Sequence, residues 1–138
     1  MTSAVLVDTT ALYGVFAPSD EHHREAVTCI QDLRAHRTPL MTTATVLVES
    51  YVLAHARLGR AGLMRFRAGV ADSTWLQVRP VSSAQEGLAW RLLEQYEDKD
   101  WSFVDATSFV VMRALKLRRA FTFDRHFAQA GFEMVPGR

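Results

Sequence analysis

The sequence is poor in several features that would direct it to particular protein classes. A single cysteine, Cys29, excludes an internal disulfide and fits a reducing compartment. No apolar run approaches the ~18 residues that suggest a membrane-spanning helix. The opening residues, MTSAVLVDTT, lack the basic region that begins a signal peptide. We therefore expect a cytoplasmic protein without a membrane partner.

The chain also lacks a glycine-rich phosphate loop, a nucleophile elbow and a CxxC pair. Lysine is nearly absent, since 14 of the 16 basic residues are arginine. Two explanations stay open: the codon bias of a GC-rich genome, and the bidentate grip of guanidinium groups on phosphate. The formal net charge is +1, so a pocket that gathered several acids would leave a mildly basic remainder. That balance permits RNA binding without proving it.

What is present fits one ordinary globular domain. The chain has 138 residues, of which 49% are hydrophobic and 22% charged, and we expect a single domain over residues 1–138. Short apolar runs bounded by turn residues predict five strands. These runs are Ala4–Val7, Pro39–Thr42, Trp75–Val78, Ala120–Phe123 and Phe132–Val135.

Helical patterns alternate with these strands, which predicts an α/β fold with a parallel sheet covered by helices on both faces. The expected helices are Thr9 or Thr10 through Phe16, Ser19 or Asp20 to about His36, Thr42 or Thr43 to Leu58, Arg60–Ala71 after Gly59, a helix begun by a Ser83–Glu86 capping box and passing Tyr96, one opening near Phe103, and a short one from Asp124 to Gly131.

Four acidic residues are expected at one edge of this sheet. Asp8 follows the first strand, and Asp124 follows the fourth. Glu49 lies early in the helix after the second strand, and Asp105 lies in the first turn of the helix that precedes the fourth. The ends of parallel strands and the first turns of the following helices share the carboxyl edge, where ligands bind. The sequence therefore predicts that the four carboxylates meet.

Taken singly, each acid has an ordinary explanation as a helix cap or a surface residue. Ser102 and Asp105 match a capping box, and Asp8 and Asp124 are possible N-caps. Glu49 stands among apolar neighbours, although an exposed stripe would accommodate it. Together, clustered carboxylates raise each other's pKa unless a cation neutralises them. Oxygen ligands with no cysteine and no convergent histidine favour Mg²⁺ or Mn²⁺ over zinc.

The segments VLVDTTAL, VLVES, WSFVDATSFVVM and FTFDRHF resemble the PIN domain family, and within it the VapC-type toxins of bacterial toxin–antitoxin pairs. The order and spacing match over essentially the whole chain. The resemblance implies a three-layer α/β/α fold whose five-stranded parallel sheet has the order 3-2-1-4-5. It also implies an endoribonuclease that hydrolyses RNA phosphodiesters with Mg²⁺- or Mn²⁺-activated water, and a homodimer silenced by a cognate antitoxin.

The resemblance further assigns roles to individual residues. Asp8 and Asp105 match the principal metal ligands, Glu49 an acid that binds metal or orients the attacking water, and Asp124 the fourth acid of the pocket. Thr122 matches a supporting hydroxyl residue two positions before that acid. Family members often carry one acid in the loop before Asp105, and whether Asp98 or Asp100 approaches the metal stays open.

The remaining histidines and apolar residues have less definite roles. We expect His22 and His23 at the surface, while His126, beside Asp124, is a candidate contact for substrate phosphate. The stripe of Leu63, Met64, Phe66 and Val70 is most simply core packing, although in the PIN family this region commonly forms an antitoxin groove.

Three other functions are weighed against a toxin nuclease. The first is a PIN-like RNA-processing nuclease without a toxin role. The second is a phosphatase that forms an aspartyl-phosphate at Asp8, although its usual D-x-D motif has threonine at position 10 here. The third is a non-enzymatic module that only holds a partner.

Overall fold

A computed structural model describes residues 3–137, which form one parallel five-stranded sheet in the order β3-β2-β1-β4-β5. The predicted fold class and strand order are therefore confirmed. The strands are short: β1 Val5–Val7, β2 Leu40–Thr43, β3 Leu76–Arg79, β4 Arg119–Phe121 and β5 Glu133–Val135. Every pairing between neighbouring strands is parallel.

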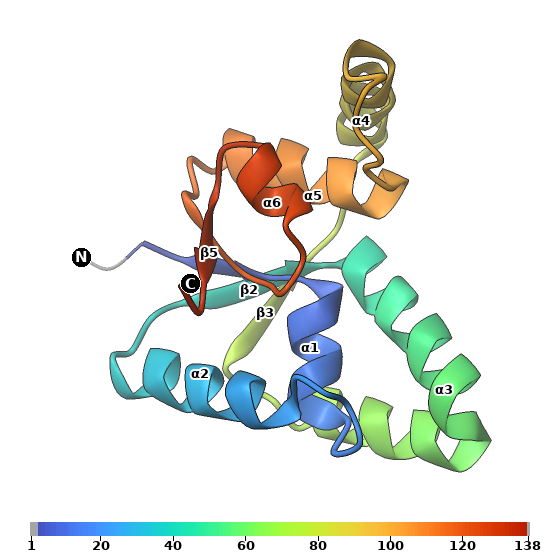
Figure 1. Cartoon of the computed structure of the whole chain (residues 1–138), viewed down its shortest axis with the longest axis vertical. Helices are drawn as coiled ribbons and strands as arrows, with labels where there is room; N and C mark the ends of the chain where they lie inside the picture. The colour runs from blue at the N-terminus through green and yellow to red at the C-terminus, as the bar shows by residue number, and fades with distance from the viewer. Residues whose placement is uncertain (1–2, 138) are drawn as a thin grey trace.

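Helices cover both faces of the sheet, which gives three layers (Figure 1). They are α1 Thr9–Phe16, α2 His23–Ala35, α3 Ala44–Ala71, α4 Ser83–Gln95, α5 Phe103–Ala114 and α6 His126–Gln129. Helices α1, α2 and α3 lie on one side of the sheet and α5 and α6 on the other, while α4 packs against α5 and projects beyond the sheet. Across residues 3–137, no helix combines the length and the apolar character that spanning a lipid bilayer requires.

The alternation of side chains along the central strands divides the core between the two faces. Val5 and Val7 pack with α1, α2 and α3, whereas Leu6 between them packs with α4 and α5. Successive strand residues point to opposite faces, and both faces here are covered. A central strand of this kind must be apolar throughout, which is why the first strand was recognisable in the sequence.

Helix α3 is divided by a kink at Gly59, whose φ of 71° and ψ of −176° lie outside the helical region. Glycine adopts a positive φ without the steric cost that a Cβ adds. The predicted division between Leu58 and Arg60 is thereby confirmed. In the second segment Phe66 and Val70 are buried, but Met64 is 48% exposed. The stripe expected to be core packing is therefore only partly buried.

The second segment of α3 approaches α1 closely at Gly69. A Cβ added there would lie 2.7 Å from Cδ1 of Phe16. The Phe16 ring is held between Phe66, at 5.8 Å between ring centroids, and Trp75, at 6.5 Å. Only a residue without a side chain fits this contact between α1 and α3.

Several predicted helix starts are wrong by one to three residues. Helix α2 begins at His23 rather than just after Asp20, because the Asp20 carboxylate accepts the His22 N–H, at 3.1 Å, in a preceding turn. Helix α4 begins at Ser83, so its capping box is formed by Ser82 and Gln85 rather than by Ser83 and Glu86. Both pairs fit the same S-x-x-[QE] spacing, and the sequence alone did not separate them.

The bounds of two strands are displaced in a similar way. Strand β3 begins at Leu76 rather than Trp75, and β4 ends at Phe121 rather than Phe123. The Phe123 N–H donates to the Thr10 hydroxyl, at 2.9 Å, instead of to a neighbouring strand. This early exit from the sheet places the residues after β4 over the end of β1.

Candidate functional site

The four acids predicted to meet lie together at the carboxyl edge of the sheet. Asp8, directly after β1, is 2% exposed, and Asp105, in the first turn of α5, is 6% exposed. Potential metal-binding atoms of Asp105, Asp124 and His126 lie within 4.8 Å of one another. The negative charges of Asp105 and Asp124 also raise the pKa values of Asp8 and Glu49. The geometry therefore brings two of the acids together with His126, and the electrostatics couples all four acids.

Thr122 links the ends of the two central strands. Its hydroxyl donates to Oδ2 of Asp8, at 2.9 Å, and accepts the backbone N–H of Asp124, at 3.0 Å. Thr10 adds a weaker contact from its hydroxyl to Asp8 Oδ2, at 3.4 Å. Because Thr122 is fully buried, these bonds fix the separation between the acid after β1 and the acid after β4.

Asp105 caps its helix and faces the site with the same carboxylate. Its Oδ2 accepts the Ser102 N–H at 3.0 Å, while its own N–H donates to Ser102 Oγ at 3.0 Å, which completes the predicted capping box. The same Oδ2 also accepts from Nδ1 of His126 at 2.8 Å. Capping leaves the second oxygen, Oδ1, without a donor among the described residues.

The other two expected caps differ from Asp105. Asp8 occupies the N-cap position of α1, but its side chain makes no capping hydrogen bond. Helix α6 begins at His126 with Arg125 at the N-cap, so the prediction of Asp124 as the cap is wrong by one residue. Asp124 instead accepts the His126 N–H through Oδ1, at 2.9 Å. For Asp8, therefore, helix capping does not explain the carboxylate.

The expectation of no convergent histidine is wrong. The Nδ1 atom of His126 lies 2.8 Å from Asp105 Oδ2 and 3.3 Å from Asp124 Oδ1. The sequence did carry a signal, because an aspartate side chain often accepts the backbone N–H of the residue two positions later and forms an Asx-turn. In such a turn the ring of a histidine at the later position can lie close to the aspartate. His22 is also not simply a surface residue, since its ring stacks on Phe123.

Burial and mutual repulsion perturb the protonation of the site. Burial, followed by the charge of Asp105, raises the pKa of Asp8 from 3.8 to about 7, although hydrogen bonds from the Thr9 backbone and the Thr122 hydroxyl oppose this change. Burial also raises the pKa of Glu49. Burial alone would lower the pKa of His126, but the hydrogen bond to Asp105 and the nearby acids outweigh it and raise the pKa.

The donor set fits a divalent cation. Among residues 3–137, no lysine or arginine forms an ion pair with Asp8, Glu49, Asp105 or Asp124. Carboxylates at close range require a neutralising charge, and oxygen ligands suit Mg²⁺ or Mn²⁺. The Thr9 hydroxyl lies near Glu49 and is buried without a hydrogen-bond partner among the described residues. It is a further oxygen at this edge that lacks a partner.

Asp98 and Asp100, in the loop before α5, differ in their relation to the acid cluster. The Asp98 side chain is 72% exposed, and its Oδ2 pairs with Lys99 Nζ at 3.1 Å. The charge of Asp100, in contrast, contributes to the raised pKa of His126. Of the two, Asp100 is the one whose field reaches the site.

Comparisons with known proteins agree with this geometry. A family model described as PIN domain matches residues 5–133. The 23S rRNA-specific endonuclease VapC20 of Mycobacterium tuberculosis is 34% identical over 132 residues, which span 95% of this chain and 97% of the relative. The crystal structure of VapC20, described as a sarcin-ricin loop cleaving toxin, matches with a TM-score of 0.81 at 33% identity, covering 94% of this chain and 96% of that one.

A more distant structure shares the fold alone. FitAcB from Neisseria gonorrhoeae matches with a TM-score of 0.70 at 14% identity, covering 94% of this chain and 95% of that one.

Proposed function

The chain belongs to the PIN domain family, and we propose that it is a metal-dependent endoribonuclease acting as the toxin of a type II toxin–antitoxin pair. The observation that carries the proposal is the set of four acids at the carboxyl edge, among which Asp8 is buried without a lysine or arginine partner within residues 3–137. A buried cluster of this kind destabilises the folded chain unless a cation binds, so its presence favours a metal-dependent function.

A bound Mg²⁺ or Mn²⁺ would polarise the scissile phosphodiester and lower the pKa of a water molecule. Asp8 and Asp105 would supply the principal ligands, and Asp124 a third. Each is pre-positioned, because one of its oxygens is held by a protein donor: Thr122 for Asp8, and His126 for the other two. Little rearrangement is then needed to bind the ion.

Glu49 is proposed to orient the attacking water or to accept its proton. Its carboxylate is half-buried, and its raised pKa makes it a stronger base than an ordinary glutamate. Glu49 lies on α3, which covers the face of the sheet opposite to α5, the helix that carries Asp105. The two acids therefore reach the same edge of the sheet from opposite faces.

The substrate is proposed to be ribosomal RNA. The support is the relative's name, a 23S rRNA-specific endonuclease, at 34% identity over nearly the full length of both chains. The preponderance of arginine is consistent with phosphate contacts, since guanidinium groups pair bidentately with phosphate oxygens.

The partners are proposed from the same relationship. We expect a cognate antitoxin, a homodimer, a single domain and a cytoplasmic location. Val48 and Val52, on the first segment of α3, are 61% and 64% exposed and lie one turn apart. Two exposed valines next to Glu49 offer an apolar surface for another protein chain close to the acids.

The aspartyl-phosphate alternative receives no support. Thr10, where a D-x-D motif has its second aspartate, bonds to Asp8, and Lys99 pairs with Asp98.

The proposal is tested by incubating the purified chain with ribosomal RNA and with a synthetic hairpin carrying the sarcin–ricin loop, in Mg²⁺, in Mn²⁺ and with a chelator. Cleavage is expected only with metal. Asp8→Asn and Asp105→Asn are expected to abolish it, whereas the exposed Asp72→Asn at the end of α3 serves as a matched control and retains it. Circular dichroism establishes that the variants fold. Equal cleavage by all four chains, or cleavage that survives the chelator, would refute the proposal.

A further inference from the structure

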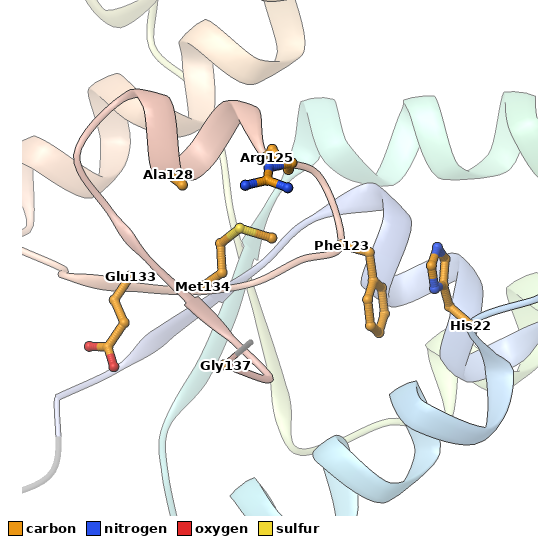
Figure 2. A pocket seen from close by; sticks show the side chains of 7 residues that line it. All are labelled: His22, Phe123, Arg125, Ala128, Glu133, Met134 and Gly137. Carbon is orange, nitrogen blue, oxygen red and sulfur yellow. The ribbon is translucent and has the colours of Figure 1, made fainter.

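A cavity adjoins the candidate metal site on the side of β5. It has a volume of about 600 Å³ and is lined by residues that include His22, Phe123, Arg125, Glu133 and Met134 (Figure 2). Phe123 and Arg125 flank Asp124 in the sequence, so the cavity begins where the acid cluster ends. Cavities of this size commonly hold small organic ligands. None of the roles assigned above uses these side chains.

One wall of the cavity is aromatic. The rings of His22 and Phe123 stack with 4.3 Å between centroids and 3° between planes. In Figure 2 the Phe123 ring lies between His22 and the other lining residues. His22 stacks on one face of Phe123, Phe121 meets the ring edge-on at 6.1 Å between centroids, and Met134 supplies an apolar floor. Flat, polarisable surfaces of this kind accept the face of a nucleobase.

The entrance of the cavity is cationic. Arg125 is exposed and forms no ion pair with any residue from 3 to 137, and Figure 2 shows its guanidinium extending toward Met134. Because no carboxylate of the described residues pairs with it, the guanidinium keeps its donors available for a phosphate at this edge. The only acid in the lining, Glu133, stands at the start of β5, whereas Asp124 follows the end of the adjacent β4.

From this arrangement we propose that the cavity binds the nucleotide adjacent to the scissile phosphate of the RNA. Its base stacks on Phe123 and packs on Met134, and Arg125 grips its phosphate. The opposite placement of Arg125 and Glu133 orients the nucleotide, because the phosphate is drawn toward the arginine and away from the carboxylate. This inference rests on the proposed ribonuclease function and adds to it a subsite that selects the substrate position.

The cavity is tested directly with the four nucleoside 5′-monophosphates, which need no cleavage to bind. The probe is the full chain labelled with ¹³C in its methionine methyl groups, in the presence of Mg²⁺. At least one mononucleotide is expected to shift the Met134 methyl signal saturably in the millimolar range, with the sign of an aromatic ring current. Met64, exposed on α3 outside the lining, supplies the reference signal and is expected to stay in place.

Two variants separate the parts of the subsite. Phe123→Leu retains apolar volume but removes the stacking face, and Arg125→Ala removes the phosphate contact. Each is expected to weaken mononucleotide binding by about fivefold or more. The matched controls are Trp90→Leu, because Trp90 on α4 forms a stacked pair with Phe103 on α5, and the exposed Arg60→Ala on α3. Both controls are expected to bind as the unaltered chain does, and thermal melting verifies that all four variants fold.

A second arm uses the sarcin–ricin hairpin, bound by the Asp8→Asn chain so that cleavage does not interfere. Bases are removed one at a time, and affinity is measured by fluorescence anisotropy. Removal of the base next to the cut is expected to weaken RNA binding. In a chain that also carries Phe123→Leu, removal of the same base is expected to have no further effect on affinity. Strictly additive losses at every position would overturn the subsite.

The outcomes distinguish this inference from the function on which it rests. A chain that cleaves RNA with metal, but whose Met134 signal responds to none of the four mononucleotides, would overturn the cavity assignment alone. A chain whose Met134 signal responds, but which cleaves no RNA in any metal, would refute the ribonuclease and support nucleotide binding at this cavity.

Discussion

Asp105 and His126, which are 21 residues apart, meet with 2.8 Å between Oδ2 and Nδ1 at the centre of the candidate metal site. The same oxygen accepts the Ser102 N–H at 3.0 Å, so two protein donors hold one side of the carboxylate. The bond also joins α5 to α6, which approach each other from different segments of the chain. The histidine is therefore a positioning residue for an acid that is expected to bind metal.

Removing this bond should lower activity without abolishing it. His126→Ala leaves the Ser102 N–H as the one donor that holds Asp105 Oδ2, and is expected to reduce the cleavage rate by about 10- to 100-fold, with weaker Mg²⁺ affinity. His126→Asn keeps a donor near the position of Nδ1 and is expected to recover much of that loss. Rates measured over a range of Mg²⁺ concentrations separate the two effects. Equal damage by both substitutions would show that the hydrogen bond is not what matters.

The stability of the metal-free chain should fall as pH rises. The pKa of Asp8 is raised from 3.8 to about 7 on folding, so between these values the folded chain binds a proton that the unfolded chain has released. The stabilising contribution is complete below the unfolded pKa and is lost as pH passes through about 7. The loss attributable to Asp8 is at most roughly 4 kcal/mol. Glu49, whose pKa is also raised, acts in the same direction.

Urea denaturation in the presence of a chelator, at about pH 5 and about pH 8, measures this effect. Asp8→Asn has no titrating carboxyl at this position, so its free energy of unfolding is expected to change less between the two conditions. It should also exceed that of the unaltered chain at the higher pH. A substituted chain that shows the same pH dependence as the original contradicts the assignment to Asp8.

Divalent cations should stabilise the folded chain at neutral pH. Binding to the native state alone adds about 2.7 kcal/mol when the free ion is at 100 times its dissociation constant. We expect Mg²⁺ or Mn²⁺ to raise the melting temperature, and NaCl at matched ionic strength to have a much smaller effect. In Asp105→Asn the divalent response should shrink. A response to NaCl as large as that to Mg²⁺ would indicate general screening instead of a site.

The hydroxyl of Thr122 should matter more than its methyl group. Thr122→Val leaves Asp124 N–H without its acceptor and Asp8 Oδ2 without its main donor, and is expected to cost about 1–3 kcal/mol. Thr122→Ser retains both bonds and should remain closer to the original. The control is Thr28→Val, because the Thr28 hydroxyl bonds to Arg24 O on the exposed surface of α2. Chemical denaturation gives the three values.

The close approach at Gly69 should not tolerate a side chain. Gly69→Ala places a methyl group 2.7 Å from a Phe16 ring already packed on both sides, and overpacking of this kind costs about 1–3 kcal/mol. Gly87→Ala, on α4, meets nothing within 4 Å and should stabilise by about 0.4–1 kcal/mol. Opposite signs in thermal melts of the two variants are the expected result, and a destabilised Gly87→Ala chain would count against the geometry of α4.

The fold was readable in the sequence because its strongest signals are local and apolar. Buried parallel strands such as Val5–Val7 must be uniformly apolar, and the alternation with helices then fixes the class. The family resemblance supplied the strand order, and both are confirmed. The convergence of Asp8, Glu49, Asp105 and Asp124 followed from the rule that strand ends and helix starts share one edge.

What the sequence did not reveal depends on hydrogen bonds between distant segments. The end of β4 is set by Thr10, which takes the Phe123 N–H from more than a hundred residues away, and no pattern near Phe123 indicates this. The role of His126, on α6, depends on its hydrogen bond to Asp105, on α5. The choice between Ser82 and Ser83 as a cap turns on a single backbone conformation, and the two residues present the same chemistry.

Asp105 both completes the capping box of α5 and belongs to the acid cluster, which affects how the chain tolerates mutation. Any substitution that removes its carboxylate also removes half of the capping box of α5 and a partner of His126, so lost function comes with a weakened fold. Glu49, half-buried on α3, caps no helix. In a population selected against the activity of this chain, inactive yet well-folded descendants should therefore carry changes at Glu49 more often than at Asp105. Sequencing the survivors of such a selection would measure how often each acid is replaced, and so identify the acids that also stabilise the fold.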